Sequence, residues 1–244
     1  MRGITDAVKH LIIINVLFFI ATAVYGDQMY QWFSLWFPEN PNFQYWQIVT
    51  HMFMHGGLMH IVFNMYGLWA FGTPLERMWG KGKFLFFYFS AGLGAALIHT
   101  GMNYYFFHEG LQALTNAGIP EQNILQIIAE GKYSPDWYNV APKSTIDMFM
   151  SSFSTPAVGA SGAIYGVLVA FAFMYSEAEL MLIFLPIPIK AKYFVPLLIL
   201  SDVFFGFSGM QTGTAHFAHI GGALIGFIMM WYWKKNQFNN KRWN

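Results

Sequence analysis

Cysteine is absent from this 244-residue sequence, and charged residues are scarce. Without cysteine, the chain can form neither disulfide bonds nor thiolate metal sites. Only 10% of the residues are Asp, Glu, Lys or Arg, whereas 56% are hydrophobic and 20% are aromatic. A soluble domain normally has about 25% charged residues. The composition therefore excludes an ordinary soluble domain and indicates a membrane protein.

Six uncharged or weakly charged apolar runs come close to the roughly 20 residues that a helix needs to cross a bilayer. They cover residues 11–27, 58–75, 84–106, 158–176, 193–208 and 216–233. The sequence contains no internal repeat and no low-complexity tract. We therefore predict an all-α, polytopic membrane protein in which a single domain, residues 1–244, contains six transmembrane helices.

Lysine and arginine are distributed unevenly around these runs. Two of the thirteen, Lys132 and Lys143, lie in the connection 107–157. The other eleven lie before run one, between runs two and three, between runs four and five, or after run six: Arg2, Lys9, Arg77, Lys81, Lys83, Lys190, Lys192, Lys234, Lys235, Lys241 and Arg242. Because cytoplasmic loops are enriched in Lys and Arg, this pattern predicts six crossings with both termini in the cytosol. We expect the membrane to be the bacterial cell membrane.

The first run imitates a secretory signal peptide, since it follows basic residues and contains Ala21-Thr22-Ala23, which looks like a cleavage site. We expect it to be a spanning helix instead, because the alternation of charge along the chain needs a crossing there.

Two connections on the predicted outer side are too long to be simple turns. Segment 28–57 is rich in aromatic residues, which settle at the depth of the lipid headgroups, so we expect a helical, interfacial first outer loop. Segment 107–157 is polar and compatible with helix around 121–130. We expect one or two short helices there, on the outer surface.

Polar side chains at membrane depth are costly unless they are paired or hydrated, so each is a functional candidate. On the predicted topology, Ser161, His219 and His60 lie near the outer ends of three helices. Asn64 follows His60 by four residues, and Tyr165 follows Ser161 by four, so the members of each pair share a helical face.

Run four contains Gly162 and Gly166, and run six contains Gly222 and Gly226. Each pair forms a Gly-x-x-x-Gly pattern, which allows two helix backbones to approach closely. Such an approach is what a hydrogen bond between the serine of run four and the histidine of run six requires.

This residue set is suited to acyl transfer. A serine hydroxyl becomes a good nucleophile when a neighbouring base takes its proton, and His219 is the candidate base. The backbone N–H of Ser161, at the start of a helix, would face a developing oxyanion, and the side chains of His60 and Asn64 are further candidate donors.

Taken together, these motifs resemble the rhomboid intramembrane serine proteases. The resemblance covers all six runs and is carried by Gly159-Ala160-Ser161-Gly162 with Tyr165, by Ala218-His219-Ile220-Gly221-Gly222 with Gly226, by His60-Ile61-Val62-Phe63-Asn64, and by Gly72-Thr73-Pro74-Leu75-Glu76.

The resemblance implies a six-helix bundle of rhomboid type with a Ser161–His219 dyad that lacks a carboxylate. It implies an oxyanion hole formed by the Ser161 amide, His60 and Asn64, with Gly159 and Gly162 beside the serine. It also implies that Tyr165 packs against the His219 ring, and that the fifth helix and the loop after it, near 193–215, act as a gate.

The chain departs from the family pattern in two places. The family often has Trp-Arg in the first outer loop, where this chain has Trp46-Gln47, so an anchoring ion pair is absent or replaced there. The connection 107–157 is also longer than in the simplest bacterial members, which affects how a substrate would reach the site.

Other polar residues admit alternatives. His216 competes with His219 for the role of base, and we favour His219 because it lies in the motif and farther from the aqueous loop. His51, His55 and His60 form a cluster in which His51 and His55 have a spacing compatible with a metal. Catalytic zinc usually has three ligands on a scaffold such as His-Glu-x-x-His, which is missing here, so we expect no metal and no cofactor. A triad that includes Asp202 has no spacing argument behind it, so Asp202 receives no role.

We therefore predict a serine endopeptidase that cuts within or beside the transmembrane segments of single-pass membrane proteins. The expected partners are these substrates and the lipid bilayer, with no nucleic acid. The alternative is a rhomboid-like pseudoprotease that binds membrane helices without cutting them. A transporter would need a continuous polar path or inverted repeats. The sequence names neither the substrate nor the oligomeric state.

Overall fold

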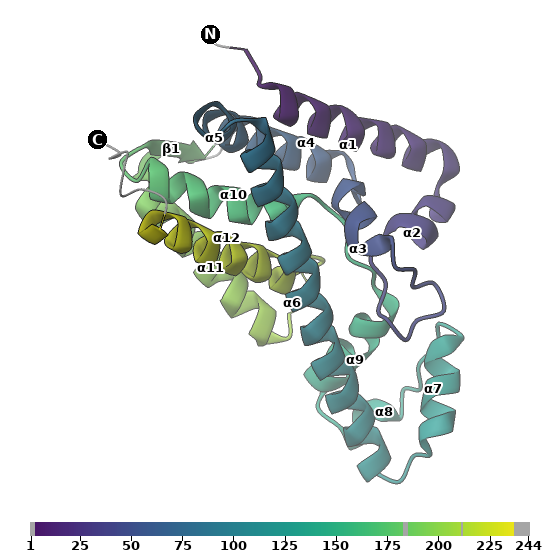
Figure 1. Ribbon diagram of the computed structural model, residues 1–244. Coiled ribbons are helices and arrows are strands. Elements are labelled where there is room, and N and C mark those ends of the chain that lie inside the picture. Colours follow the sequence, from purple (N-terminus) through teal and green to yellow (C-terminus); the bar gives the residue numbers. More distant parts are fainter. Residues whose placement is uncertain (1–2, 183–184, 211, 237–244) are drawn as a thin grey trace.

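Each of the six apolar runs forms a helix in the computed structural model (Figure 1). The structure describes residues 3–182, 185–210 and 212–236. The helices of the runs are α1 (Asp6–Tyr25), α4 (Leu58–Gly67) continued by the π-helical segment η2 (Leu68–Gly72) and α5 (Thr73–Trp79), α6 (Lys81–Asn116), α10 (Ser161–Met174), α11 (Ala191–Ser208) and α12 (His216–Asn236). The predicted helical membrane bundle is confirmed. Arg2, Lys241 and Arg242, which contributed to the predicted orientation, lie outside the described residues.

By length and composition, three of the described helices could each cross a membrane: α1, α6 and α11. Helix α10 is apolar but shorter, at 14 residues. Large apolar side chains face outward on α1 and α11, among them Leu17, Leu200 and Phe204, each more than half exposed. Surfaces of this kind are suited to contact with lipid tails. The number of six crossings stays a prediction.

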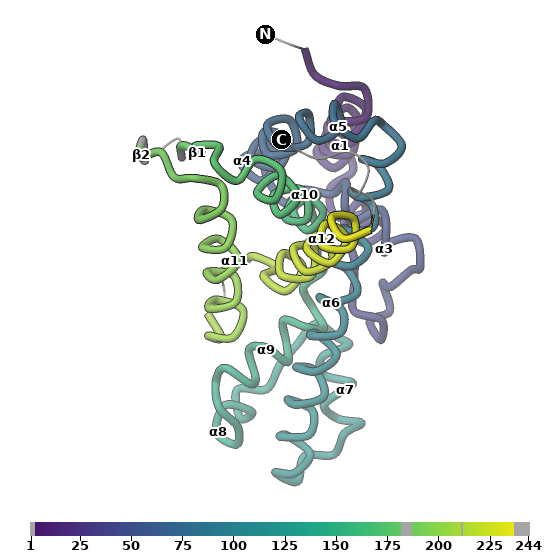
Figure 2. Tube along the Cα trace, turned by 60° about the vertical axis from the view of Figure 1, so that its left-hand side comes forward, coloured from purple at the N-terminus to yellow at the C-terminus, as the bar shows by residue number. Residues whose placement is uncertain are grey.

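Helix α6 runs diagonally through the molecule and connects its two parts (Figure 1). At 1.5 Å per residue, its 36 residues span roughly 54 Å, well beyond a hydrocarbon core of about 30 Å. Helices α10 and α12 pack along its N-terminal half, and α11 lies to the side, next to α12 (Figure 2). The far end of α6 is therefore free to support a second group of helices.

That second group, here called the outer helical group, consists of α7 (Glu121–Ala129), α8 (Trp137–Val140) and α9 (Lys143–Ser154). Its helices share an apolar core with the end of α6 and one phenylalanine of the first outer loop: Phe37, Phe107, Leu114, Ile124, Ile128, Trp137, Ile146, Phe149 and Phe153. We expected one or two short helices in the connection 107–157, whereas the structure has three. The first ten residues of this connection, 107–116, continue α6. The long connection is structured because it has its own core.

The first outer loop contains α2 (Asp27–Phe33), α3 (Gln47–Thr50) and the 3₁₀ segment η1 (His51–Phe53). Gln47, where the sequence departs from the pattern of the resemblance, is fully buried. Its side-chain Nε2 donates to the carbonyl oxygens of Gln31 (2.9 Å) and Asn42 (2.8 Å), and its Oε1 accepts from the Gln44 N–H (3.1 Å). An uncharged amide with backbone partners therefore holds this loop together, in place of an ion pair.

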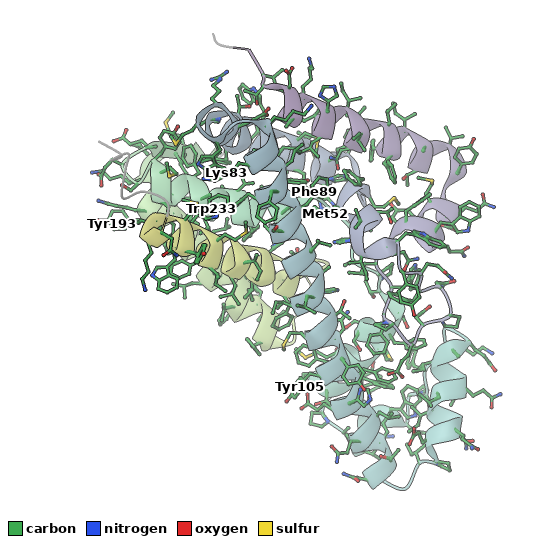
Figure 3. The ribbon with its side chains drawn as sticks, viewed as in Figure 1. Met52, Lys83, Phe89, Tyr105, Tyr193 and Trp233 are labelled. Atoms are coloured by element: carbon green, nitrogen blue, oxygen red, sulfur yellow. The ribbon has the colours of Figure 1, made fainter. Side chains whose placement is uncertain are left out.

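Met52 of this loop reaches α6, where it fills the space left by a glycine (Figure 3). A β-carbon built at Gly92 would lie 2.2 Å from the Met52 Cε atom. At the end of the bundle where α6 starts, the Lys83 Nζ lies 4.1 Å from the centre of the Trp233 ring of α12 (Figure 3). These contacts tie α6 to the first outer loop and to α12.

Glu76 of α5 anchors the start of α1. Its two carboxylate oxygens accept hydrogen bonds from the backbone N–H groups of Ala7 (2.8 Å) and Val8 (2.9 Å), and the residue is 5% exposed. The first N–H groups of a helix have no partner within the helix, so the carboxylate satisfies two of them. This glutamate thus connects the first two helical runs at their shared end.

A short antiparallel pair of strands, which the sequence analysis did not predict, joins α10 to α11. Strands β1 (Glu179–Leu182) and β2 (Leu185–Lys190) place Glu179 opposite Lys190. Next to them, Glu177 accepts hydrogen bonds from Lys190 (2.8 Å) and Lys192 (2.5 Å), and these two bonds lower the pKa of Glu177 to about 2.

Candidate active site

Ser161 and His219 meet where two helices begin. Ser161 is the first residue of α10, and His219 lies in the first turn of α12. The Ser161 hydroxyl donates to the His219 Nε2 over 2.9 Å. The two residues are 58 positions apart in the sequence, so packing between the helices creates this contact. A hydroxyl bonded to an imidazole nitrogen is the arrangement of an activated nucleophile.

The glycines of α10 and α12 let these helices touch through their backbones. A β-carbon built at Gly222 would lie 1.8 Å from the carbonyl oxygen of Gly162, and one built at Gly226 would lie 2.6 Å from the Gly166 Cα. On its other side, Gly162 faces Ala95 of α6, with 2.5 Å between the built β-carbon and the alanine Cβ. The predicted close-packing glycines therefore lie in the contact that brings Ser161 to His219.

Backbone hydrogen bonds hold the segment that leads into Ser161. Leu35 and Ala157 form an antiparallel bridge with two bonds of 2.9 Å, and the Gly159 N–H donates to the His51 carbonyl over 2.9 Å. Gly159 has φ +122°, which favours glycine, and a β-carbon there would lie 2.8 Å from the His60 Nε2. Glycine at 159 thus leaves room for the His60 ring beside the serine.

His60 and Asn64 are placed differently with respect to the site. The His60 Nδ1 accepts from the Gly56 N–H over 3.3 Å, so its Nε2 is the nitrogen near Gly159. Asn64 is buried, and its Nδ2 donates to the His60 carbonyl of the same helix over 2.8 Å. Of the two side chains, His60 shares the wall of one cavity with Ser161.

Tyr165 stacks on the catalytic candidate His219. The ring centres are 4.1 Å apart, with 14° between the planes. The Tyr165 hydroxyl donates to the Asp202 Oδ2 over 2.5 Å. Asp202, to which the sequence analysis assigned no role, also accepts hydrogen bonds from His216 and His219. The sequence signal that could have found it was the cost of a carboxylate within an apolar run.

A cavity of about 810 Å³ opens over the serine and histidine. His60, Ser161, His216 and His219 contribute to its wall from the membrane helices, and Met148 and Ser151 contribute from α9. The outer helical group therefore forms one side of the space above the candidate catalytic atoms. A volume of this size lies within the range of about 300–1,000 Å³ that is typical of ligand-binding cavities.

The histidines of the first outer loop behave as structural groups. The His51 Nδ1–H donates to the Gln47 carbonyl over 2.8 Å, and burial lowers the pKa of His51 to about 4. Burial likewise lowers the pKa of His55 to about 4. Both rings are therefore neutral near pH 7 and bond within the loop.

Within the described part of the chain, one group could ligate a metal ion: Asp202, His216 and His219, with ligand atoms within 4.8 Å of one another. Both histidines already hydrogen-bond to the Asp202 carboxylate, an arrangement that needs no ion. The metal alternative raised for His51 and His55 involves different residues.

Comparison with known proteins places these motifs in a family. The model of the Rhomboid domain matches residues 42–118 and 123–236 of the chain. The chain belongs to the rhomboid family. The matched residues of this rhomboid domain include Ser161, His219, His60 and Asn64. The short unmatched interval, 119–122, covers part of the turn after α6 and the first two residues of α7. The predicted family and the fold class are thereby confirmed.

Individual relatives agree with the family model. The chain is 26% identical over 241 residues to RHOMBOID-like protein 12, mitochondrial, of Arabidopsis thaliana. The matched residues cover 98% of this chain and 62% of that protein. It is 25% identical over 191 residues to Rhomboid protein 1, mitochondrial, of Saccharomyces cerevisiae, covering 77% of this chain and 42% of that protein. It is also 40% identical over 72 residues to Rhomboid protease GlpG of Salmonella newport, covering 29% of this chain and 26% of that protein. The chain thus spans less than two thirds of the length of these relatives.

Proposed function

We propose that this rhomboid-family protein is an intramembrane serine endopeptidase that cuts peptide bonds within or beside transmembrane segments of single-pass membrane proteins. The hydrogen bond of 2.9 Å between the Ser161 hydroxyl and the His219 Nε2, at the wall of a cavity, is the observation that carries the proposal. Relatives named as rhomboid proteases support it.

In the proposed reaction, His219 takes the hydroxyl proton while the Ser161 Oγ forms a bond to the substrate carbonyl carbon. The tetrahedral intermediate collapses when the C–N bond breaks and the leaving nitrogen receives the proton from His219. Water then attacks the acyl ester, gives a proton to His219, and the proton returns to the Ser161 oxygen. Atoms and protons balance, and the enzyme is restored.

Two groups support the oxyanion in this proposal. The Ser161 N–H is the first of α10, where backbone N–H groups lack helical partners and the helix dipole is positive. The His60 Nε2 lies beside Gly159, on the approach to the serine. Asn64 would contribute mainly by holding the helix turn that carries His60, since its Nδ2 donates to the His60 carbonyl.

The substrate must present an extended peptide bond to these groups. A peptide bond in a helix is hydrogen-bonded and shielded by side chains, so small and helix-breaking residues near the cut are expected. We propose an orientation with both termini in the cytosol, based on the Lys and Arg distribution. A bacterial cell membrane stays a prediction, because the relatives come from bacteria and mitochondria alike.

Labelling with a fluorophosphonate probe tests the nucleophile directly. We expect the purified wild-type protein to be labelled, because the probe phosphorus reacts with an activated serine oxygen, and we expect Ser161→Ala and His219→Ala to lose the label. In-gel fluorescence measures the result.

Ser154→Ala is the matched control for that experiment, because Ser154 is an exposed serine at the end of α9 and should leave labelling unchanged. Labelling that persists in Ser161→Ala would remove the nucleophile from the proposal. Folded wild-type protein that binds a membrane substrate, but neither cuts it nor takes up the probe, would instead be the pseudoprotease.

The oxyanion donors should differ in effect. We expect His60→Ala to lower kcat about 10²- to 10³-fold, because this ring lies on the approach to Ser161. Asn64→Ala should cost less than His60→Ala, because the amide already bonds within its helix. Cleavage kinetics of a reconstituted substrate measure both, and a larger loss in Asn64→Ala than in His60→Ala would contradict the assignment.

A further inference from the structure

Asp202 is a charged residue on the buried face of α11, which it shares with Ala191, Val195 and Gly206. It is 4% exposed, whereas its α11 neighbours Leu200 and Phe204 are 63% and 61% exposed. A carboxylate in such surroundings is costly unless it is fully hydrogen-bonded. Its partners therefore indicate what it does.

Three donors converge on this carboxylate, and none of them belongs to α11. The His219 Nδ1–H donates to Oδ1 over 3.0 Å, and the His216 Nδ1–H donates to the same oxygen over 2.6 Å. The Tyr165 hydroxyl donates to Oδ2 over 2.5 Å. Both oxygens are thus satisfied, which lets the carboxylate stay ionised where it is buried.

The contact with His219 determines which ring nitrogen carries the proton. A neutral imidazole has one donor and one acceptor nitrogen. With Nδ1–H directed at Asp202, the Nε2 lone pair faces the Ser161 hydroxyl at 2.9 Å. This is the tautomer that a general base needs. The negative charge also stabilises the imidazolium that forms when His219 takes the proton.

His216 cannot replace His219 in this arrangement. Its Nδ1 is bonded to Asp202, and its Nε2 is bonded to the Thr212 hydroxyl over 2.6 Å. Both of its ring nitrogens are therefore occupied by partners other than the serine.

The ring of Tyr165 stacks on the ring of His219 and further limits how His219 can rotate.

We propose that Asp202 is a positioning residue that orients and charges the His219 base, so that this chain uses a Ser161–His219–Asp202 triad. The proposal rests on the proposed protease function. It departs from the dyad without a carboxylate that the resemblance to rhomboid proteases implies. Asp202 does not touch the substrate; it acts through the histidine, as the third member of a serine-protease triad does.

Asp202→Asn tests the charge with little change in shape. We expect kcat to fall about 10²- to 10⁴-fold, because the amide removes the charge and can favour the wrong tautomer of His219. KM should stay within about threefold, because no substrate contact is lost. Asp202→Glu restores a carboxylate and should recover at least about tenfold over Asp202→Asn.

Ser201→Ala is the matched control, because Ser201 is the neighbour of Asp202 in α11 and its hydroxyl donates to the Leu198 carbonyl of that same helix. This variant should keep the wild-type kcat. A kcat of Asp202→Asn within about threefold of wild type, or Asp202→Glu no better than Asp202→Asn, would overturn the positioning role. Should Ser161→Ala still cut the substrate, the protease proposal itself fails.

A measurement on the unmodified protein covers the case in which Asp202→Asn does not fold. With ¹⁵N-labelled histidine in wild-type protein in detergent micelles, the His219 signals should show a protonated Nδ1 with a strong hydrogen bond and an unprotonated Nε2. His219→Gln assigns these signals by their loss. An unprotonated Nδ1 on His219 would overturn the triad without any activity assay.

Discussion

Ser161→Ala and His219→Ala should each lower the rate constant for cleavage of a transmembrane substrate by about 10⁴- to 10⁶-fold, because nucleophile and base act as one unit. For the same reason, the double variant should be no slower than either single variant. Cleavage of a single-pass model substrate, reconstituted with the purified protein in liposomes, measures these rates.

Folding must be checked beside the rates. The Ser161 hydroxyl lies at the cavity wall, so its loss should leave the thermal midpoint near that of the wild type, as should the exposed-serine control Ser154→Ala. His219→Ala removes one of the donors to Asp202, so a modest fall in its thermal midpoint is expected. If the losses of the single variants multiplied in the double variant, the two residues would be acting independently. The dyad would then be the wrong description of this site.

Gly222→Ala should disrupt the protein more than any other single methyl group added to α12. The new β-carbon would lie 1.8 Å from the carbonyl oxygen of Gly162, far inside van der Waals contact. The neighbour is backbone, so it cannot rotate away, and the two helices must separate. We expect a destabilisation of about 3 kcal/mol or more, because overpacking typically costs about 1–3 kcal/mol even where side chains can adjust.

Separation of α10 from α12 should also remove the hydrogen bond between Ser161 and His219, so probe labelling should fall with the thermal midpoint. Gly101→Ala in α6 is the control, because a β-carbon there meets no atom within 4 Å. That variant should be neutral or slightly stabilising, by up to about 1 kcal/mol of helix propensity. Equal thermal midpoints for the Gly222→Ala and Gly101→Ala proteins would contradict the close contact.

Part of the fold could be predicted from hydropathy alone. Each of the six apolar runs has a helix, because a segment in a membrane must satisfy its backbone groups internally. The extension of α6 to Asn116 and the three helices of the outer group could not be read from these runs. These helices are held in place by a shared core that includes Phe37, which lies 70 positions before Phe107 in the sequence. Contacts between residues so far apart leave no periodic signal in the sequence.

The candidate site divides in the same way. Residues four positions apart share a helical face, so the pairing of His60 with Asn64 and of the glycines in α10 and α12 could be predicted from local helix geometry. The role of Gln47 as the anchor of the first outer loop depends on carbonyl groups of Gln31 and Asn42, which no motif points to. The position of α9 beside the cavity likewise depends on how the outer helical group packs.

From the sequence alone follow the membrane environment, the helical runs, the rhomboid family motifs and the residues that could carry chemistry, because these depend on composition and on local spacing. Only the tertiary structure places the Asp202 carboxylate against His219, since the two residues lie on different helices, 17 positions apart. Which face of one helix meets which face of another depends on packing of the whole bundle. That packing turns a serine, a histidine and a carboxylate from three helices into one site.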